Sequence, residues 1–191
     1  MLLHTPRLIL RLFNDSDLEP FLAYRNDPYV AKYQGWSIPY PRESGEAFIR
    51  EVRDIHAPKQ GQWMQIAVAL KGNNKLIGDI GCLVKQEDAR QAMIGYRLDS
   101  GVWRKGYAFE AIHCWLGYLF DDLNMHRVVA DCDTENTASC CLLEKLGFRR
   151  EAHFIESYLE NGAYTDEYHY GLLEREWQAR FAARSALRIA G

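Results

Sequence analysis

The chain has 191 residues and a net charge of −3, with 48% apolar and 26% charged residues. This length predicts one domain, residues 1–191, because a domain usually holds about 100–200 residues. The composition is that of a globular protein and excludes disordered, collagen-like and coiled-coil chains. A pI near 6.1 argues against nucleic acid as a partner, since proteins dedicated to nucleic acid carry a basic excess.

No stretch approaches the roughly 18 consecutive apolar residues of a membrane span, so no membrane association is expected. Residues 1–7 lack the layout of a signal peptide, which predicts a cytoplasmic location. The five cysteines are odd in number and lack Cys-x-x-Cys spacing, so we expect reduced thiols and no metal site. A monomer and a homodimer both remain open.

The N-terminal part of the chain predicts one strand and two helices around a long loop. Residues 7–13 alternate in the manner of a half-buried strand. Ser16-x-x-Glu19 is a capping-box signature for the helix that follows. Residues 26–41, rich in Pro, Tyr, Gly and Trp, predict a loop with room for one helical turn, and residues 43–56 predict the second helix.

The middle of the chain predicts a hairpin, two further strands and a helix. Residues 63–70 and 76–84 alternate on either side of a polar turn, as the two strands of a β-hairpin do. Residues 92–99 predict another strand, residues 106–120 a helix with one apolar face, and residues 126–133 a strand.

The C-terminal part predicts a helix over 136–146, two strands over 148–158 and 164–172, and a last helix over 174–189. The two strands flank Glu160-Asn161-Gly162, and Asn-Gly is a strong hairpin signal. Antiparallel hairpins therefore surround one strand–helix–strand–helix segment. This order predicts an α+β, mixed α/β domain.

Residues 103–108 predict an anion-binding helix start. Arg104 and Lys105 precede Gly106, and the following helix begins with unpaired N–H groups and the positive end of its dipole. Small residues at 106 and 108 let an oxygen approach the backbone closely. Phosphate or pyrophosphate would suit this arrangement. A basic helix start without a ligand explains it equally well, because it matches neither the P-loop nor the GxGxxG pattern.

A second polar pattern lies at the start of the predicted helix 136–146. Asn136 and Ser139 are three residues apart, so both side chains can face the same groove. Each residue type also caps helices, and capping is the alternative explanation for both.

Together the two patterns resemble the GNAT acetyltransferase superfamily, in the branch that includes ribosomal-protein N-terminal alanine or serine acetyltransferases. Residues 103–108 resemble its acetyl-CoA pyrophosphate loop, Arg/Gln-x-x-Gly-x-Gly/Ala, from which Trp103 departs at the first position. Asn136-x-x-Ser139 followed by Lys145-Leu146-Gly147-Phe148 resembles the second cofactor motif of that branch.

The resemblance covers Thr5 to Tyr168 and implies the GNAT fold, a central mixed, mostly antiparallel sheet of about seven strands flanked by helices. It implies transfer of the acetyl group of acetyl-CoA to a primary amine, without a metal. The pantetheine arm would lie beside residues 94–98 and the pyrophosphate against 104–108. The cofactor-binding residues expected from the resemblance are Tyr96, Arg97, Leu98, Arg104, Lys105, Gly106, Tyr107, Ala108, Asn136, Ser139 and Lys145.

The resemblance also implies catalytic roles. Ser139 is expected to act as the general acid for the leaving thiolate, with a helix cap or a cofactor contact as the alternative. Glu110 is one candidate for the general base, and an internal hydrogen bond is its alternative role. The last predicted hairpin offers further candidate bases, which are Glu156, Asp166 and Glu167. Loss of the proton to solvent without a base is a further option.

Tyr33 and Trp36, in the loop 29–40, are expected to contact the acceptor, although aromatic residues there could instead seal the edge of the core. A protein α-amine, with a pKa of about 7.7–8.0, is easier to deprotonate than a lysine side chain at about 10.4. The loop holds no carboxylate, which disfavours a polycationic acceptor. The alternatives are a small amine (aminoglycoside, polyamine or amino acid) as acceptor and a non-catalytic acyl-CoA sensor.

Overall fold

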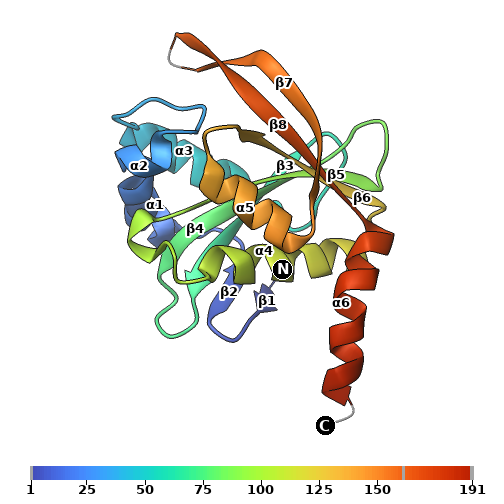
Figure 1. Cartoon of the computed structure of the whole chain (residues 1–191). Helices are drawn as coiled ribbons and strands as arrows, with labels where there is room; N and C mark the ends of the chain where they lie inside the picture. The colour runs from blue at the N-terminus through green and yellow to red at the C-terminus, as the bar shows by residue number, and fades with distance from the viewer. Residues whose placement is uncertain (1, 161, 190–191) are drawn as a thin grey trace.

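Eight strands form one sheet in the computed structural model, in the order β1-β2-β3-β4-β5-β6-β8-β7 (Figure 1). The structure describes residues 2–160 and 162–189, with side chains placed for 2–159 and 162–181. The strands are β1 Leu2–His4, β2 Leu8–Arg11, β3 Trp63–Leu70, β4 Leu76–Val84, β5 Gln91–Leu98, β6 Arg127–Asp133, β7 Arg149–Glu160 and β8 Ala163–Leu173. The helices are α1 Leu18–Arg25, α2 Pro28–Ala31, α3 Arg42–Val52, α4 Tyr107–Gly117, α5 Thr137–Leu146 and α6 Glu174–Ile189.

The mixed α/β fold expected from the sequence is confirmed, with one strand more than the seven expected. The extra strand is β1, which pairs with β2 but has only three residues and no interior alternation to reveal it. The predicted helix over 106–120 divides into α4 and a π-helical turn at Tyr118–Asp122. Asn161, in the predicted hairpin turn, lies outside the described residues.

Helices cover the two faces of the sheet unequally, so the protein has two apolar cores. The larger core lies between the sheet and helices α4, α5 and α6, with Trp115 fully buried at its centre. The smaller core lies between β2–β4 and helices α1–α3, around Phe21 and Tyr24. Each large apolar side chain buried in this way contributes about 1.5–3 kcal/mol to folding. The smaller core ends at β4, which leaves that face of β5, β6 and β8 without a helix.

Alternation along the strands explains how one chain supplies both cores. Ile77 of β4 points into the larger core, whereas its neighbour Leu76 points into the smaller one. Within residues 2–160 and 162–189, no helix has the length and apolar character needed to cross a membrane.

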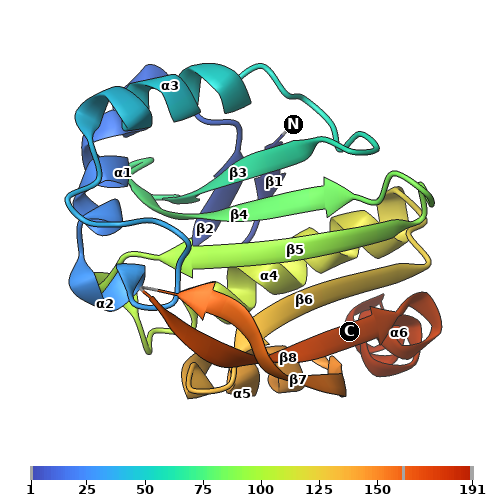
Figure 2. The same cartoon turned by 90° about the horizontal axis from the view of Figure 1, so that it is seen from above.

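The two central strands, β5 and β6, are parallel and separate along their length. Pairing joins Gln91–Met93 to Arg127–Val129 and then stops, although β5 runs on to Leu98 and β6 to Asp133. Over the same stretch β5 stays paired with β4, and β6 stays paired with β8. The sheet therefore opens between two strands that are each held firmly on their other side (Figure 2).

Candidate active site

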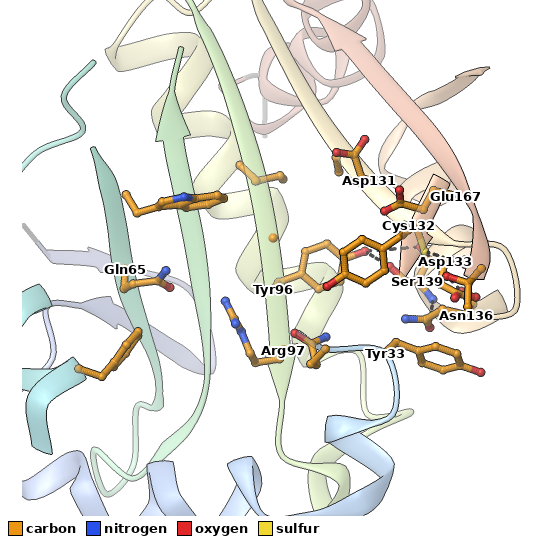
Figure 3. Close-up of a pocket in the computed structure, with 18 of the residues that line it drawn as sticks. Tyr33, Gln65, Tyr96, Arg97, Asp131, Cys132, Asp133, Asn136, Ser139 and Glu167 are labelled. Carbon is orange, nitrogen blue, oxygen red and sulfur yellow. Dashed lines mark hydrogen bonds between the residues drawn. The ribbon is translucent and has the colours of Figure 1, made fainter. Parts of the chain in front are cut away.

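A cavity of about 570 Å³ occupies the opening between β5 and β6 (Figure 3). Because side chains alternate along a strand, different residues line the cavity on the two faces of the sheet. Tyr96 and Cys132 line it on the side of α4 and α5, and Arg97 and Asp131 line it on the side of α1–α3. A Cβ added to Gly95 would meet no atom within 4 Å, so the hollow reaches the β5 backbone itself. The cavity therefore passes through the sheet.

Three polar residues meet where the cavity faces α5. Asn136 caps this helix, and its Oδ1 accepts a hydrogen bond of 3.2 Å from the Ser139 N–H. The Tyr96 hydroxyl lies 2.8 Å from Ser139 Oγ, and either oxygen can donate. Burial raises the pKa of Tyr96, so its phenol stays protonated at neutral pH. The structure thus brings together the Asn136/Ser139 pattern and β5, the strand before the glycine loop. Asn136 both caps α5 and lines the cavity.

The start of α4 has the backbone conformation that an anion site needs. Gly106 precedes the helix with φ +80°, and Arg104 also has a positive φ, of +59°. The first turn of an α-helix has N–H groups without intrahelical acceptors, and a diphosphate suits them. Lys145 of α5 lies beside this turn, with Nζ 5.0 Å from the Phe109 ring centre. The Lys105 ammonium instead donates to the Gly101 carbonyl at 2.8 Å and stabilises the loop.

Trp103, which departs from the family pattern, has a structural function. Its indole N–H donates to the Leu98 carbonyl at 2.8 Å and so ties the glycine loop to the end of β5. The Arg97 side chain turns away from the glycine loop, and its Nε forms an ion pair with Asp79 at 2.9 Å. The expected cofactor contacts of Arg97 and Leu98 are therefore left to their backbone groups.

Glu110 is sequestered in a hydrogen-bonded latch that joins α4 to the N-terminal segment. Thr5 Oγ1 donates to Glu110 Oε1 at 2.6 Å, and Arg7 Nε donates to Oε2 at 2.6 Å. Arg7 also donates to the Lys105 carbonyl at 2.9 Å, and its guanidinium lies 4.4 Å from the Tyr107 ring centre. Burial acts to raise the pKa of Glu110, but the hydrogen bonds from Thr5 and Arg7 outweigh it and hold the pKa below its ordinary value. The geometry favours the internal hydrogen-bond role over the general base.

The two aromatic residues expected to contact the acceptor have different positions. Tyr33 lines the cavity, and its hydroxyl donates to the Glu135 carbonyl at 3.2 Å. Trp36 does not belong to the lining. Its indole N–H donates to the Arg25 carbonyl at 2.9 Å, and its ring lies 3.8 Å from the Arg25 guanidinium carbon. Tyr33 thus lines the cavity, whereas Trp36 packs against the smaller core.

Carboxylates line the cavity on the α1–α3 side, which removes the ground for the expectation that a polycationic acceptor is disfavoured. That expectation considered only the loop 29–40, and the carboxylates come from α3, β6 and β8. They are Glu51, Asp131, Asp133 and Glu167. Of the candidate bases on the last hairpin, Glu167 lines the cavity. Asp166 instead accepts hydrogen bonds from His153 and from the Glu156 N–H.

Sequence reasoning missed Asp131 and the Tyr96 hydroxyl. Asp131 lies inside a strand and belongs to no motif. Alternation within 126–133 could have placed it on the face opposite Val128 and Ala130. The Tyr96–Ser139 contact joins residues 43 positions apart, and no local pattern indicates it.

Comparison with known proteins supplies the family. The model of the acetyltransferase (GNAT) domain matches residues 7–149. The chain belongs to the GNAT acetyltransferase family. It is 32% identical to the uncharacterized N-acetyltransferase YnaD of Bacillus subtilis, over 91% of this chain and 97% of that protein. It is 25% identical to the ribosomal protein uS5-alanine N-acetyltransferase of Escherichia coli, over 92% of each chain.

A solved GNAT-family acetyltransferase from Bacillus anthracis has the same fold, with a TM-score of 0.82 and 31% identity over 92% of this chain and 99% of that one. As a GNAT member, the protein is an N-acetyltransferase that uses acetyl-CoA as cosubstrate. A non-catalytic sensor is not favoured. Among the residues that the structure describes, no cluster of His, Cys, Asp and Glu is arranged to hold a metal ion.

Replacement Gly106→Val tests the anion site at the start of α4. We expect affinity for acetyl-CoA to fall at least about tenfold, because a side chain at φ +80° is strained and obstructs the approach to the backbone. Isothermal titration calorimetry measures the affinity. Gly72→Val is the matched control, since nothing lies within 4 Å of that position. Equal affinity in both variants would contradict the assignment.

Replacement Glu110→Gln separates the latch from the general base. The lowered pKa of Glu110 means that its carboxylate stabilises the fold above about pH 4.5 and that this contribution is lost as pH falls through the lowered value. We expect a loss of about 1 kcal/mol in the free energy of unfolding at pH 7, and almost none near pH 3, in urea titrations. The pH profile of the acetylation rate should keep its shape; loss of its acid limb would restore the base role.

Proposed function

We propose that this protein transfers the acetyl group of acetyl-CoA to a primary amine by direct attack on the thioester, in the opening between β5 and β6. The observation that carries the proposal is the cavity through the sheet. One side offers Tyr96, Asn136 and Ser139, and the other offers carboxylates for a cationic acceptor. Acetyl-CoA and acceptor would thus approach the reacting carbon from opposite faces.

The β5 edge suits both the cofactor arm and the developing oxyanion. Residues 94–98 face the opening without β6 as a pairing partner, so their backbone groups are available to the amides of the pantetheine arm, as for an added strand. When the amine nitrogen attacks the thioester carbon, negative charge develops on the carbonyl oxygen. A backbone N–H of this edge would stabilise that charge.

Ser139 is the proposed donor to the leaving group. Collapse of the tetrahedral intermediate breaks the C–S bond and leaves the thiolate of coenzyme A. A thiolate is a good leaving group, so a hydrogen bond suffices where a strong acid is absent. The Tyr96 hydroxyl at 2.8 Å orients the serine hydroxyl and remains protonated itself.

The first candidate acceptor is the α-amine of a protein N-terminus. An α-amine loses its proton at about pH 7.7–8.0, close to neutral conditions. The Escherichia coli relative is a ribosomal protein alanine N-acetyltransferase, which supports this candidate. A small polycationic amine is the second candidate, because four carboxylates line the acceptor side. The cytoplasmic location and the choice between monomer and homodimer stay predictions.

An acceptor panel tests the proposal. Thiol release from acetyl-CoA is measured with peptides that begin with Ala or Ser, with the same peptides N-terminally blocked, and with spermidine and single amino acids. We expect release with a free α-amine and none with the blocked peptide, and mass spectrometry should show one added acetyl group. Turnover of spermidine alone would select the second candidate. Binding of acetyl-CoA without acetylation of any amine would overturn the proposed reaction.

Replacement Ser139→Ala tests the proposed hydrogen bond to the leaving thiolate. We expect kcat to fall about tenfold or more while the Kd of acetyl-CoA changes less than about twofold, because only the thiolate has gained the charge that Ser139 would stabilise. Stopped-flow thiol detection and calorimetry measure the two quantities. Cys141→Ala, an exposed position on the same helix, is the control. An unchanged kcat would remove Ser139 from the reaction.

A further inference from the structure

The attacking amine must lose a proton, and the carboxylate of Glu110 is already occupied by Thr5 and Arg7. A group that accepts this proton is therefore expected among the residues at the cavity. The carboxylates that line it are Glu51, Asp131, Asp133 and Glu167. A lone carboxylate is a weak base toward an ammonium group, since their ordinary pKa values differ by several units.

Asp131 differs from the other lining carboxylates because it is joined to an imidazole. Its Oδ1 lies 2.5 Å from Nδ1 of His169, its cross-strand neighbour on β8. Asp133 instead accepts the Glu135 N–H at 2.7 Å, and Glu167 accepts the hydroxyl of a serine at 3.0 Å. Asp131 therefore connects the cavity to an imidazole, whose second ring nitrogen can accept a proton.

The position of Asp131 suits an acceptor amine. Met93 of β5 pairs with Val129 of β6 as the last rung before the strands part. Two residues further along, on the same faces of their strands, Gly95 and Asp131 border the opening from its two sides. The Asp131 side chain is 37% exposed, so its second oxygen is accessible to a cation above the bare backbone of Gly95.

The contact with Asp131 fixes the tautomer of a neutral His169. A carboxylate oxygen accepts, so Nδ1 carries the proton and Nε2 keeps the free electron pair. The His169 side chain is 26% exposed, and solvent can reach it. The ring can therefore receive one more proton at Nε2 while it stays oriented by Asp131.

We propose that Asp131 binds the ammonium group of the acceptor and that His169 takes up its proton through solvent. This inference rests on the proposed acetylation of a primary amine. An N–H bond of the ammonium breaks, an N–H bond forms at His169 Nε2, and the freed electron pair attacks the thioester carbon. A C–N bond forms, the nitrogen gives its second proton to solvent, and the C–S bond breaks to leave the amide and the thiolate. The Ser139 hydroxyl stabilises the thiolate by a hydrogen bond until the thiolate gains a proton from solvent. The imidazolium of His169 then returns its proton to solvent.

The charges around the pair are mostly negative, which attracts a cationic acceptor. On the same face of the sheet are Asp133, Glu167 and the ion pair of Arg127 with Glu151, and Glu51 and Arg97 face the cavity from α3 and β5. Arg149 also pairs with Glu151 and with Glu176, so that two arginines and two glutamates balance one another, and Arg97 is paired with Asp79. An amine that reaches Asp131 therefore meets carboxylates, and among the described residues that line the cavity the one arginine, Arg97, is already paired.

The same hairpin provides an internal control. Nε2 of His153 in β7 lies 2.7 Å from Asp166 of β8, so this is a second histidine–aspartate pair, joined through the other ring nitrogen. Neither residue lines the cavity between β5 and β6, whereas Asp131 of the other pair does. If a histidine–aspartate pair mattered only for the stability of the hairpin, both pairs would respond alike to substitution.

The experiment compares the pH profiles of kcat/KM for wild type, His169→Gln, Asp131→Asn and His153→Gln with the best amine of the acceptor panel. We expect His169→Gln to lower kcat/KM at pH 7 by about 100-fold, the lower end of what a general base supplies. The kcat/KM of this variant should recover as the pH rises above the pKa of the free amine, because the amine then arrives already deprotonated. Asp131→Asn should lose activity at neutral pH and raise KM for the amine. His153→Gln should stay within about twofold of wild type.

Calorimetry with acetyl-CoA and thermal unfolding accompany each variant, and both should match wild type for His169→Gln. If that variant fails to fold, the loss of activity at neutral pH and the raised KM for the amine in Asp131→Asn decide the question. Wild-type activity with an unchanged profile in the folded variants would overturn the inference and leave the proposed function standing. A wild type that binds acetyl-CoA but acetylates no amine would overturn the proposed function, and the inference with it.

Discussion

The separation of β5 from β6 after three paired residues is the constraint on which the rest of the structure depends. Unpaired strand edges are costly when buried, because each N–H and C=O needs a partner. The sheet sustains the opening since β4 and β8 hold the outer edges of the two strands in continuous register. A ligand with amide groups of its own, such as the pantetheine arm, can complete the missing ladder. One irregularity thereby supplies both the space and the hydrogen-bonding capacity of the site.

The elements that follow each open strand complete the site. β5 leads into the glycine loop and α4, and β6 leads into the Asn136 cap and α5. Two helix starts therefore lie at the same end of the opening, as is common for ligand sites at the carboxyl ends of parallel strands. Ser139 and Tyr96 join the two halves through their hydroxyl groups. The chemistry thus depends on how accurately one strand–helix unit sits against the other.

Local patterns in the sequence predicted most of the fold, because the periods of strands and helices are set by burial on one face. They also predicted the two helix starts of the site, because glycine and asparagine are residue types that commonly precede a helix, as Gly106 and Asn136 do. They could not predict contacts across the sheet. The Tyr96–Ser139 and Asp131–His169 contacts depend on how distant strands and helices are placed against one another. The sequence likewise does not show that the Glu110 carboxylate is hydrogen-bonded by Thr5 and Arg7. For the loop 26–41, the sequence could not show which aromatic residue contacts the cavity: Tyr33 lies at the cavity, whereas Trp36 packs against the smaller core.

The latch on Glu110 joins the N-terminal segment to the start of α4, where the diphosphate of acetyl-CoA is proposed to bind. Arg7 holds the carbonyl of Lys105 and the carboxylate of Glu110 at once, on either side of Gly106. An affinity tag fused close to Thr5, or a start codon chosen a few codons downstream, would thus disturb coenzyme recognition while the catalytic side chains stayed intact.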